Sequence, residues 1–293
     1  METVGIVGTG AMGLGVARAL LAKGFAVHAH DIVPERQAAA VALGAVGCGS
    51  AMEAGRAASV VITVVVDAAQ TRAVLFGERG LCGTLARGST LMMCSTIAPR
   101  DSEALADELA GAGISMLDAP ISGGPARAHA GTLTVMASGP AAAFTACESV
   151  LDAMSAKCFR VSGRAGDGSR MKVVNNMLAA ANLAAGCEAM AMASKLGLDL
   201  RQVREVVNAS SGGSWIFTDR MARALEGDAS VHAAARVLAK DVGLFVDTAR
   251  DLGLPAPMSE CAREIFLDTV ARGFGEEDDS AVLRRYLEIY GKK

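Results

Sequence analysis

The order of apolar and polar positions divides the chain into two parts with different periodicities. Up to about residue 162, short β-branched runs such as 59–66 alternate with alanine-rich stretches of helical spacing such as 98–110. This alternation is typical of a mostly parallel, doubly wound sheet with helices on its faces, an α/β fold. A turn-rich break at 163–168 follows, and no convincing strand pattern occurs beyond it. The sequence therefore predicts an α/β domain over residues 1–162 and an all-α domain over residues 163–293.

Individual elements can be placed from the same periodicity. In the first part, strands are expected at 4–7, 25–27, 59–66, 91–94, 114–117 and 133–137, and helices at 11–22 and 98–110. In the second part, helices are expected at 169–196, 199–207, 233–252, 258–272 and 281–290. Trp215 lies in a glycine- and serine-rich segment that is predicted to be a turn. The apolar stretch 173–193 contains three asparagines and a glutamate, which are costly in a lipid bilayer, so we interpret it as a buried helix of a soluble domain.

Three glycines mark the turn after the first predicted strand. Gly8, Gly10 and Gly13 follow the apolar run 4–7 and open the helix that starts at Ala11. In a dinucleotide-binding βαβ unit, the first glycine allows a tight turn, the second lets backbone approach a pyrophosphate, and the third lets the helix pack on the strand. The free N–H groups of the helix then face the phosphates. We therefore predict a Rossmann-type dinucleotide-binding domain with contacts from Gly8, Gly10, Ala11, Met12 and Gly13.

An acidic residue after the second predicted strand indicates which dinucleotide is bound. Asp31 lies at about the 20-residue offset expected for the carboxylate that binds an adenine ribose. A carboxylate accepts hydrogen bonds from both ribose hydroxyls and repels a 2′-phosphate, so NAD is favoured over NADP, a preference that Arg36 could weaken. The alternative is a glycine turn with no ligand, and the ordered strand, helix and acid argue against it.

Composition excludes several classes of partner. The chain has 293 residues, 28 basic and 31 acidic side chains and a net charge of −3, with the two signs interspersed. No basic stripe for nucleic acid and no polybasic membrane patch is present, so a small molecule is the expected partner. The seven cysteines are scattered and form no C-x-x-C pair, which favours free thiols in a reducing, cytoplasmic compartment. We expect no targeting segment, because the N-terminal apolar run lacks a charged stretch before it and contains the glycine motif.

Two further segments carry groups suited to hydroxyl chemistry. The segment 118–125 begins at the end of an apolar strand and contains Ser122, Gly123 and Gly124. Successive N–H groups there can form a concave nest for a carboxylate, with the serine hydroxyl as a further donor; the alternative is a glycine and proline turn without a ligand. Lys172 and Asn176 lie four residues apart near the start of a long helix and so share a face that is otherwise apolar. A lysine there can exchange a proton with a hydroxyl, whereas most helical lysines are solvated surface charges.

The histidines carry less information. His28 and His30 alternate along the strand that leads to Asp31, and no cysteine or carboxylate lies at metal-ligand spacing, so no metal site is expected. His129 follows the serine-glycine turn and either lines the substrate pocket or belongs to a solvated loop.

Together these blocks resemble the β-hydroxyacid dehydrogenases of the 3-hydroxyisobutyrate dehydrogenase family. The resemblance rests on the order and spacing of four blocks: the glycine motif at 7–13, the segment 118–131, the pattern Gly166-x-Gly168-x3-Lys172-x3-Asn176, and Lys240-Asp241. It implies oxidation of a small hydroxy acid with NAD, on a Rossmann domain followed by an all-α domain through which the chain forms a homodimer or homotetramer. The implied roles are a carboxylate site at Ser122, Gly123 and Gly124, Lys172 as general acid/base, Asn176 as a substrate-orienting residue, and cofactor contacts from Val65, Thr96 and Lys240. Separately, Trp215, Phe217 and His129 are the side chains expected to contact the distal end of the substrate.

The branch within this family is less sharply indicated. Blocks such as Ser214-Trp215-x-Phe217 and 277–282 are similar to enzymes that oxidise a four-carbon sugar acid at C2, whereas Asn175-Asn176 is the pair found in 3-hydroxyisobutyrate enzymes. A 3-hydroxyisobutyrate dehydrogenase and a tartronate semialdehyde reductase therefore stay open as alternatives. Outside hydroxy-acid chemistry, a non-catalytic dinucleotide-binding protein and an imine reductase are the competing hypotheses, and retention of Lys172 with Asn176 argues against both.

Overall fold

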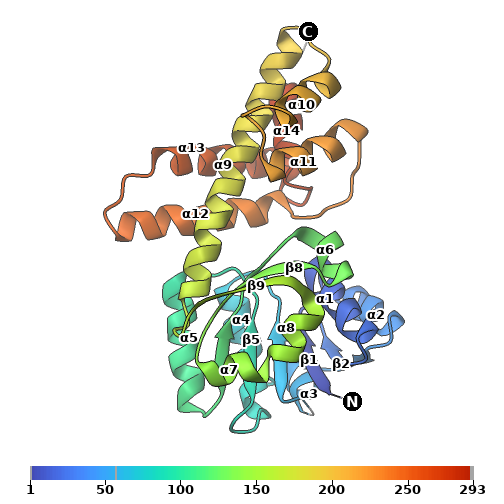
Figure 1. The fold of residues 1–293 in the computed structure, drawn as a ribbon, viewed down its shortest axis with the longest axis vertical. Coiled ribbons are helices and arrows are strands. Elements are labelled where there is room, and N and C mark those ends of the chain that lie inside the picture. Colours follow the sequence, from blue (N-terminus) through green and yellow to red (C-terminus); the bar gives the residue numbers. More distant parts are fainter. Residues whose placement is uncertain (1, 57, 291–293) are drawn as a thin grey trace. The chain divides into compact units, whose positions relative to one another are not determined.

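The computed structural model describes residues 2–56 and 58–290, and it divides into two compact units, Met1–Lys172 and Val173–Lys293 (Figure 1). The elements of the first unit are β1 (Thr3–Val7), α1 (Ala11–Ala22), β2 (Ala26–His30), α2 (Pro34–Ala42), β3 (Val46–Gly47), α3 (Ala51–Gly55), β4 (Val60–Thr63), α4 (Ala68–Phe76), β5 (Thr90–Met93), α5 (Pro99–Gly111), β6 (Ser115–Asp118), β7 (Ile121–Ser122), α6 (Gly124–Ala130), β8 (Leu133–Ser138), α7 (Ala141–Ala146), α8 (Glu148–Met154) and β9 (Ser155–Ser162). Helix α9 (Asp167–Lys195) starts in the first unit and continues into the second, which also contains α10 (Leu200–Asn208), α11 (Trp215–Glu226), α12 (Ala235–Asp251), α13 (Pro257–Thr269) and α14 (Ala281–Tyr290).

The first unit is built on one sheet. Its strands follow the order β3-β2-β1-β4-β5-β6-β8-β7, and β9 pairs with β8. The strands from β1 to β6 are mutually parallel, whereas β8 runs antiparallel to β6 and β7. The prediction of a doubly wound, mostly parallel sheet followed by a helical part is confirmed.

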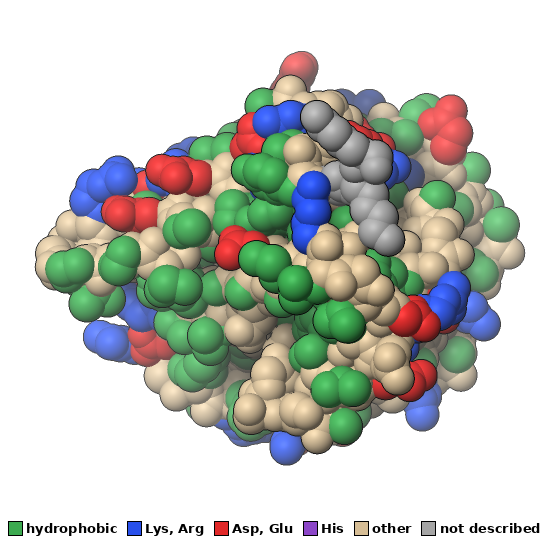
Figure 2. All heavy atoms as spheres, turned by 90° about the horizontal axis from the view of Figure 1, so that it is seen from above, with side chains coloured by type: hydrophobic (Ala, Val, Ile, Leu, Met, Phe, Trp, Pro, Cys, Tyr) green, Lys and Arg blue, Asp and Glu red, His purple; other side chains and the backbone are tan. Residues whose placement is uncertain are grey.

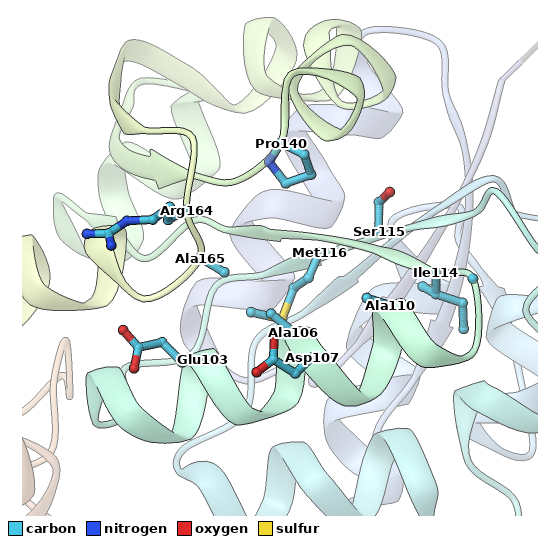
Figure 3. Close-up of a pocket in the computed structure, with 11 residues that line it drawn as sticks. Glu103, Ala106, Asp107, Ala110, Ile114, Ser115, Met116, Pro140, Arg164 and Ala165 are labelled. Carbon is cyan, nitrogen blue, oxygen red and sulfur yellow. The ribbon is translucent and has the colours of Figure 1, made fainter.

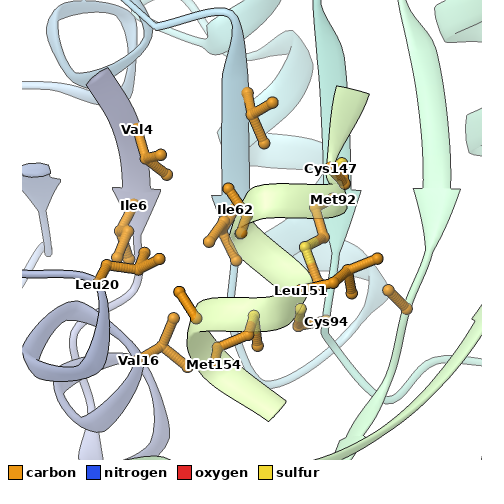
Figure 4. Packing of buried hydrophobic residues seen from close by; sticks show 14 of the residues in the cluster. Val4, Ile6, Val16, Leu20, Ile62, Met92, Cys94, Cys147, Leu151 and Met154 are labelled. Atoms are coloured by element: carbon orange, nitrogen blue, oxygen red, sulfur yellow. The ribbon is translucent and has the colours of Figure 1, made fainter. Parts of the chain in front are cut away.

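Alternating side chains of the parallel strands build a separate core on each face of the sheet. Val4 and Ile6 of β1 pack with Val16 and Leu20 of α1 and with residues of α7 and α8 (Figure 4). Val7 points to the opposite face of the sheet from Val4 and Ile6, and it packs there with residues of α3, α4 and α5. Strands buried on both sides need helices on both sides, which is why this half of the chain alternates strand and helix.

The second unit is an all-α assembly around α9. Ala180, Leu183, Cys187 and Met190 of this helix are buried against a cluster that includes Phe266 of α13. α9 is the one described helix that is long and apolar enough to cross a bilayer, and 44 % of its most apolar window is buried inside the structure. These contacts agree with the interpretation of 173–193 as a core helix.

Some predicted elements require correction. The strand predicted at 59–66 ends at Thr63, so Val64, Val65 and Val66 belong to the following loop. Trp215 is not in a turn but is the first residue of α11, because the Ser214 hydroxyl accepts a hydrogen bond from the Phe217 N–H at 3.2 Å and caps that helix. Ser211 and Gly212 do form a turn, and a helix that the pattern did not predict begins directly after Ser214.

Charged side chains of both signs lie near one another on the face of the protein that Figure 2 shows. On the face shown in Figure 2, Lys and Arg side chains lie next to Asp and Glu side chains among apolar and neutral ones. That distribution agrees with the absence of a basic stripe in the sequence.

A buried ion-pair cluster in the second unit makes the stability of the protein dependent on acid. Asp278 is 5 % exposed and accepts hydrogen bonds from the Arg223 guanidinium and from the backbone N–H groups of His232 and Ser280. Burial alone would raise the pKa of Asp278, but its hydrogen bonds with Ser280, His232 and Arg223 hold the pKa at about 2.

We predict that Asp278→Asn removes a pH-dependent stabilisation. Because the pKa of Asp278 is lowered on folding, its contribution is fully present above the unfolded pKa and is lost as pH falls from about 4 to about 2. A shift of this size corresponds to about 2 kcal/mol. Urea unfolding at pH 5 and at pH 3 should therefore show a smaller difference between the variant and the wild type at the lower pH. A difference that is equal at both pH values contradicts the assignment.

Candidate active site

The register of the sheet aligns the ends of four strands. Val7 of β1 pairs with Thr63 of β4, Thr63 pairs with Met93 of β5, and Met93 pairs with Asp118 of β6. The loops that follow these residues therefore leave the sheet along one edge, the carboxyl edge at which open α/β sheets bind ligands. The segments that follow these four strand ends contain predicted cofactor and substrate residues of the first unit: Gly8 to Gly13, Val65, Thr96, and Ser122 to Gly124.

The glycine loop has the geometry of a phosphate-binding turn. Gly8 has a φ of 95°, and a β-carbon on Gly13 would lie 1.9 Å from the Gly8 carbonyl oxygen, so both positions require glycine. A β-carbon on Gly10, in contrast, would meet no atom within 4 Å. No side chain caps the start of α1, which begins with Ala11, Met12 and Gly13. The open space at Gly10 beside uncapped helix N–H groups fits the pyrophosphate of a dinucleotide.

Asp31 is held in place by this same loop. Its Oδ2 accepts a hydrogen bond from the Thr9 N–H at 2.7 Å, and its Oδ1 accepts one from the Val33 N–H at 2.9 Å. The Thr9 hydroxyl lies 3.4 Å from Oδ2 as a further donor, so of the roughly four acceptor positions of the carboxylate one stays open on Oδ1 for a ribose hydroxyl. The side chain is partly exposed, as a ligand-binding acid must be.

Val65 and Thr96 lie in neighbouring loops that are joined by a hydrogen bond. The Val65 N–H donates to the Ser95 hydroxyl at 3.1 Å. Thr96 follows Ser95 directly, so the two predicted cofactor residues are positioned by one contact. Ser95 itself is buried and was not predicted as a functional residue.

The predicted carboxylate nest lies at the end of β7. Ser122 is the last residue of β7, and Gly123 and Gly124 follow with φ values of 131° and 74°. Positive φ at two successive residues is strongly disfavoured for other residue types, which explains the paired glycines. A β-carbon on Gly124 would meet no atom within 4 Å, so this part of the backbone is open to a ligand.

Lys172 meets this segment directly. Its side chain is buried, with 7 % exposure, and its Nζ donates a hydrogen bond of 2.7 Å to the carbonyl oxygen of Ile121. Ile121 precedes Ser122, so the amine is held next to the predicted carboxylate nest. Asn176 lies one turn further along α9, on the same side of the helix.

In the second unit, Asn176 and Lys240 meet at a third residue. Asn176 Nδ2 donates to Asp241 Oδ2 at 2.6 Å, and Lys240 Nζ lies 2.6 Å from Asp241 Oδ1. Asp241 is 4 % exposed and was not predicted as a site residue. An acidic residue within the apolar face of a predicted helix was the available signal, since a buried carboxylate must be paired.

The other candidates have simpler environments. Trp215 is half exposed at the start of α11, and His129 of α6 is partly buried. His30 Nδ1 is hydrogen-bonded to the Cys48 carbonyl oxygen at 2.9 Å, so it serves the packing of β2 and β3. Over residues 2–56 and 58–290, no group of three or more His, Cys, Asp or Glu side chains is arranged to hold a metal ion.

A cavity of about 670 Å³ lies elsewhere in the first unit (Figure 3). Ile114, Ser115 and Met116 at the amino end of β6 line it together with residues of α5 and with Pro140 and Arg164. The aligned loops described above lie at the carboxyl end of β6, so this cavity is separate from them.

Comparison with known proteins identifies the two halves of the chain. Residues 3–163 match the NAD binding domain of 6-phosphogluconate dehydrogenase, and residues 166–286 match the NAD-binding domain of NADP-dependent 3-hydroxyisobutyrate dehydrogenase. An L-threonate dehydrogenase of Cupriavidus necator is 42 % identical over 99 % of both chains, and a 3-hydroxyisobutyrate dehydrogenase of Pseudomonas aeruginosa is 34 % identical over 91 % of both.

A solved structure agrees with these relatives. The crystal structure of a 3-hydroxyisobutyrate dehydrogenase from Salmonella typhimurium matches with a TM-score of 0.91 and 40 % identity, covering 97 % of this chain and 100 % of that one. The glycine loop, the buried lysine and the two-part fold thus occur together with full-length similarity to dehydrogenases that use a nicotinamide dinucleotide. The chain belongs to the β-hydroxyacid dehydrogenase family and is an oxidoreductase that acts on hydroxy acids.

Proposed function

We propose that the protein oxidises L-threonate at C2 to its 2-oxo acid, with NAD as the hydride acceptor. The observation that carries this proposal is the position of the Lys172 amine, 2.7 Å from the Ile121 carbonyl oxygen and next to Ser122, Gly123 and Gly124. A 2-hydroxy acid has its carboxylate and hydroxyl on neighbouring atoms, and it therefore needs an anion site and a proton acceptor close together. Several relatives named L-threonate dehydrogenase, 37–42 % identical over nearly the whole chain, support the choice of substrate.

Each residue has a defined task in this reaction. The Ser122 hydroxyl and the N–H groups of Gly123 and Gly124 bind the substrate carboxylate. Lys172 takes the proton from the C2 hydroxyl and returns it to solvent. Asn176, oriented by its bond to Asp241, positions the substrate, and Trp215 contacts its distal end. Bound NAD supplies the acceptor for the hydride that leaves C2.

The cofactor is held by the remaining candidate residues. We assign the pyrophosphate to Gly8, Gly10, Ala11, Met12 and Gly13. Asp31 takes the adenine ribose, and this carboxylate makes NAD the preferred dinucleotide because it repels a 2′-phosphate. Val65 is a further cofactor contact, Thr96 contacts the cofactor near the nicotinamide, and Lys240 is also assigned to cofactor binding.

A 3-hydroxyisobutyrate dehydrogenase is the second candidate. Asn175 Nδ2 donates to Asn176 Oδ1 at 3.1 Å, so the asparagine pair acts as one polar unit beside the proposed substrate position. That pair, together with the 34 % identical relative from Pseudomonas aeruginosa, favours the branched substrate. A tartronate semialdehyde reductase is a further member of the same group of candidates.

Assembly and location complete the proposal. We propose a homodimer or homotetramer formed through the second unit, where Leu196, Leu252 and Met258 are among the large apolar side chains that are more than half exposed. We also propose a cytoplasmic location, which the seven free cysteines support, since a reducing compartment keeps thiols unpaired.

The choice of substrate is tested by the purified protein at saturating NAD. We expect NADH formation with L-threonate at a kcat/KM at least about 10-fold above that with 3-hydroxyisobutyrate, a difference of about 1.4 kcal/mol in transition-state binding. A preference for 3-hydroxyisobutyrate selects the second candidate, and activity with neither rejects both substrates.

We predict that Lys172→Ala lowers kcat by about 10²- to 10⁴-fold, the usual contribution of a general acid/base. The affinity for NAD should stay within about twofold of wild type, because the cofactor contacts are on other loops. Lys195→Ala, an exposed lysine in the last turn of the same helix, is the matched control and should keep its activity. Wild-type turnover in the Lys172 variant would reject the proposed mechanism.

A third experiment tests the proposed pyrophosphate site. Gly10→Ala places a methyl group in open space, so thermal stability should be unchanged while the affinity for NADH, measured by its fluorescence, falls about 10-fold or more. Gly111→Ala at the end of α5 also meets no atom within 4 Å and serves as the control. Equal affinity in both variants would show that Gly10 does not face the cofactor.

A further inference from the structure

A buried carboxylate lies beneath the proposed site without a role in the reaction as described. Asp118, the last residue of β6, is fully buried among apolar neighbours that include Leu117 and Ala119. A charged group in such surroundings is costly unless it is fully hydrogen-bonded. The hydrogen-bond partners of Asp118 therefore indicate its role in the structure.

Most partners of Asp118 come from the start of α9. Its Oδ2 accepts hydrogen bonds from the N–H groups of Gly166 at 2.8 Å and Ser169 at 2.9 Å, and its Oδ1 accepts one from the Ser169 hydroxyl at 2.8 Å. A further partner is the Ser138 hydroxyl, at 3.4 Å from Oδ2, and this hydroxyl accepts the Gly168 N–H at 2.8 Å.

These bonds make Asp118 the cap of α9 from a distant part of the chain. Gly166, Gly168 and Ser169 supply N–H groups that have no partner within the helix, and an anion is favoured at that end by the helix dipole. The fit leaves no room for a side chain at Gly168, where a β-carbon would lie 2.6 Å from the Asp118 carbonyl oxygen. Burial raises the pKa of the Asp118 carboxyl, and the hydrogen bonds from Ser169 and Gly166 oppose that shift.

The cap belongs to a closed ring of contacts that includes the lysine. Lys172 follows Ser169 by three residues, so its backbone lies one turn beyond the capped end. Its amine bonds to the Ile121 carbonyl, and Ile121 follows Asp118 by three residues along the chain. Asp118, which caps the helix, and Ile121, which accepts the hydrogen bond of the amine, thus lie on the same short segment. This segment continues into Ser122, Gly123 and Gly124.

We infer that Asp118 is a positioning residue for Lys172. It anchors the start of α9 to the segment that contains Ser122, Gly123 and Gly124, and it thereby sets the distance between the Lys172 amine and the carboxylate nest. This role rests on the proposed function of Lys172. Asp118 touches neither substrate nor cofactor; it acts through the backbone of residues 166–172. Displacement of a catalytic group by about 1 Å costs about 10²-fold in rate, so a loosened cap should affect kcat more than binding.

The test compares two Asp→Asn changes at the same helix end. Asp118→Asn replaces an acceptor oxygen by an amide that faces N–H donors, and we expect kcat to fall about 10- to 100-fold, with the affinity for NAD within about twofold of wild type. Asp167→Asn is the control, because Asp167 is the first residue of α9 but bonds to Ser162 and Arg170 rather than to Asp118. It should keep kcat within about threefold of wild type, even where both variants lose thermal stability.

A second readout is independent of any substrate. Trinitrobenzenesulfonate modifies lysine amines, and mass spectrometry of the Lys172 peptide reports the rate in the full-length protein. We expect this rate to rise about 10-fold in Asp118→Asn and to be unchanged in Asp167→Asn, because only the first change frees the amine from its fixed position. The labelling result stands even if neither hydroxy acid is oxidised, so failure of the substrate assignment and failure of this inference are distinguishable.

A milder variant covers the case in which Asp118→Asn does not fold. Ser169→Ala removes only the bond from the serine hydroxyl to Asp118 Oδ1, and we expect a decrease in kcat and an increase in Lys172 labelling in the same directions but of smaller size. Wild-type labelling and kcat in Ser169→Ala and in folded Asp118→Asn, or equal changes in Asp167→Asn, would overturn the inference.

Discussion

The hydrogen bond between the Lys172 amine and the Ile121 carbonyl is the contact on which the proposed chemistry depends. An amine that is only 7 % exposed is expensive to bury and must be given an acceptor. The acceptor is the backbone carbonyl immediately before Ser122, so the hydrogen bond that compensates the buried amine also places it beside the proposed carboxylate site. In the proposed reaction, the substrate hydroxyl replaces the Ile121 carbonyl as the hydrogen-bond partner of the amine, and the substrate carboxylate lies beside it.

The sheet supplies the frame for this contact. Because Val7, Thr63, Met93 and Asp118 are in register across four parallel strands, the loops after them reach the same edge without long connections. The cofactor loops and the nest are therefore neighbours as a consequence of strand pairing. Asp118 extends the frame to α9, because it ends the last of these strands and also caps the helix that carries Lys172.

Features set by local sequence could be predicted, and those set by distant partners could not. Gly8, Gly10 and Gly13 could be predicted because they all belong to one turn whose backbone geometry favours glycine. The bounds of α1 are those that its periodicity predicts. β9, in contrast, has partly or fully exposed residues throughout and hence no alternating pattern, and it is a strand because β8 lies beside it. α11 was missed because its cap, Ser214, follows two glycines that are typical of turns.

The same division applies to the site. Lys172, Asn176 and the serine-glycine segment were predicted from residue type and spacing, whereas the carboxylates that orient them were not. Asp118 meets Ser169 across 51 residues of chain and Asp241 meets Asn176 across 65, and no local pattern contains that information. The sequence therefore indicates candidate groups for the chemistry more readily than the groups that hold them in place.

The most direct test of this account is a crystal structure of the protein with NAD and a hydroxy acid bound after substitution of Lys172 by methionine, which preserves length but takes no proton. We predict that the substrate carboxylate accepts hydrogen bonds from Ser122, Gly123 and Gly124, with the hydroxyl directed at the end of the residue 172 side chain. A carboxylate bound elsewhere, with these N–H groups facing solvent, would contradict it.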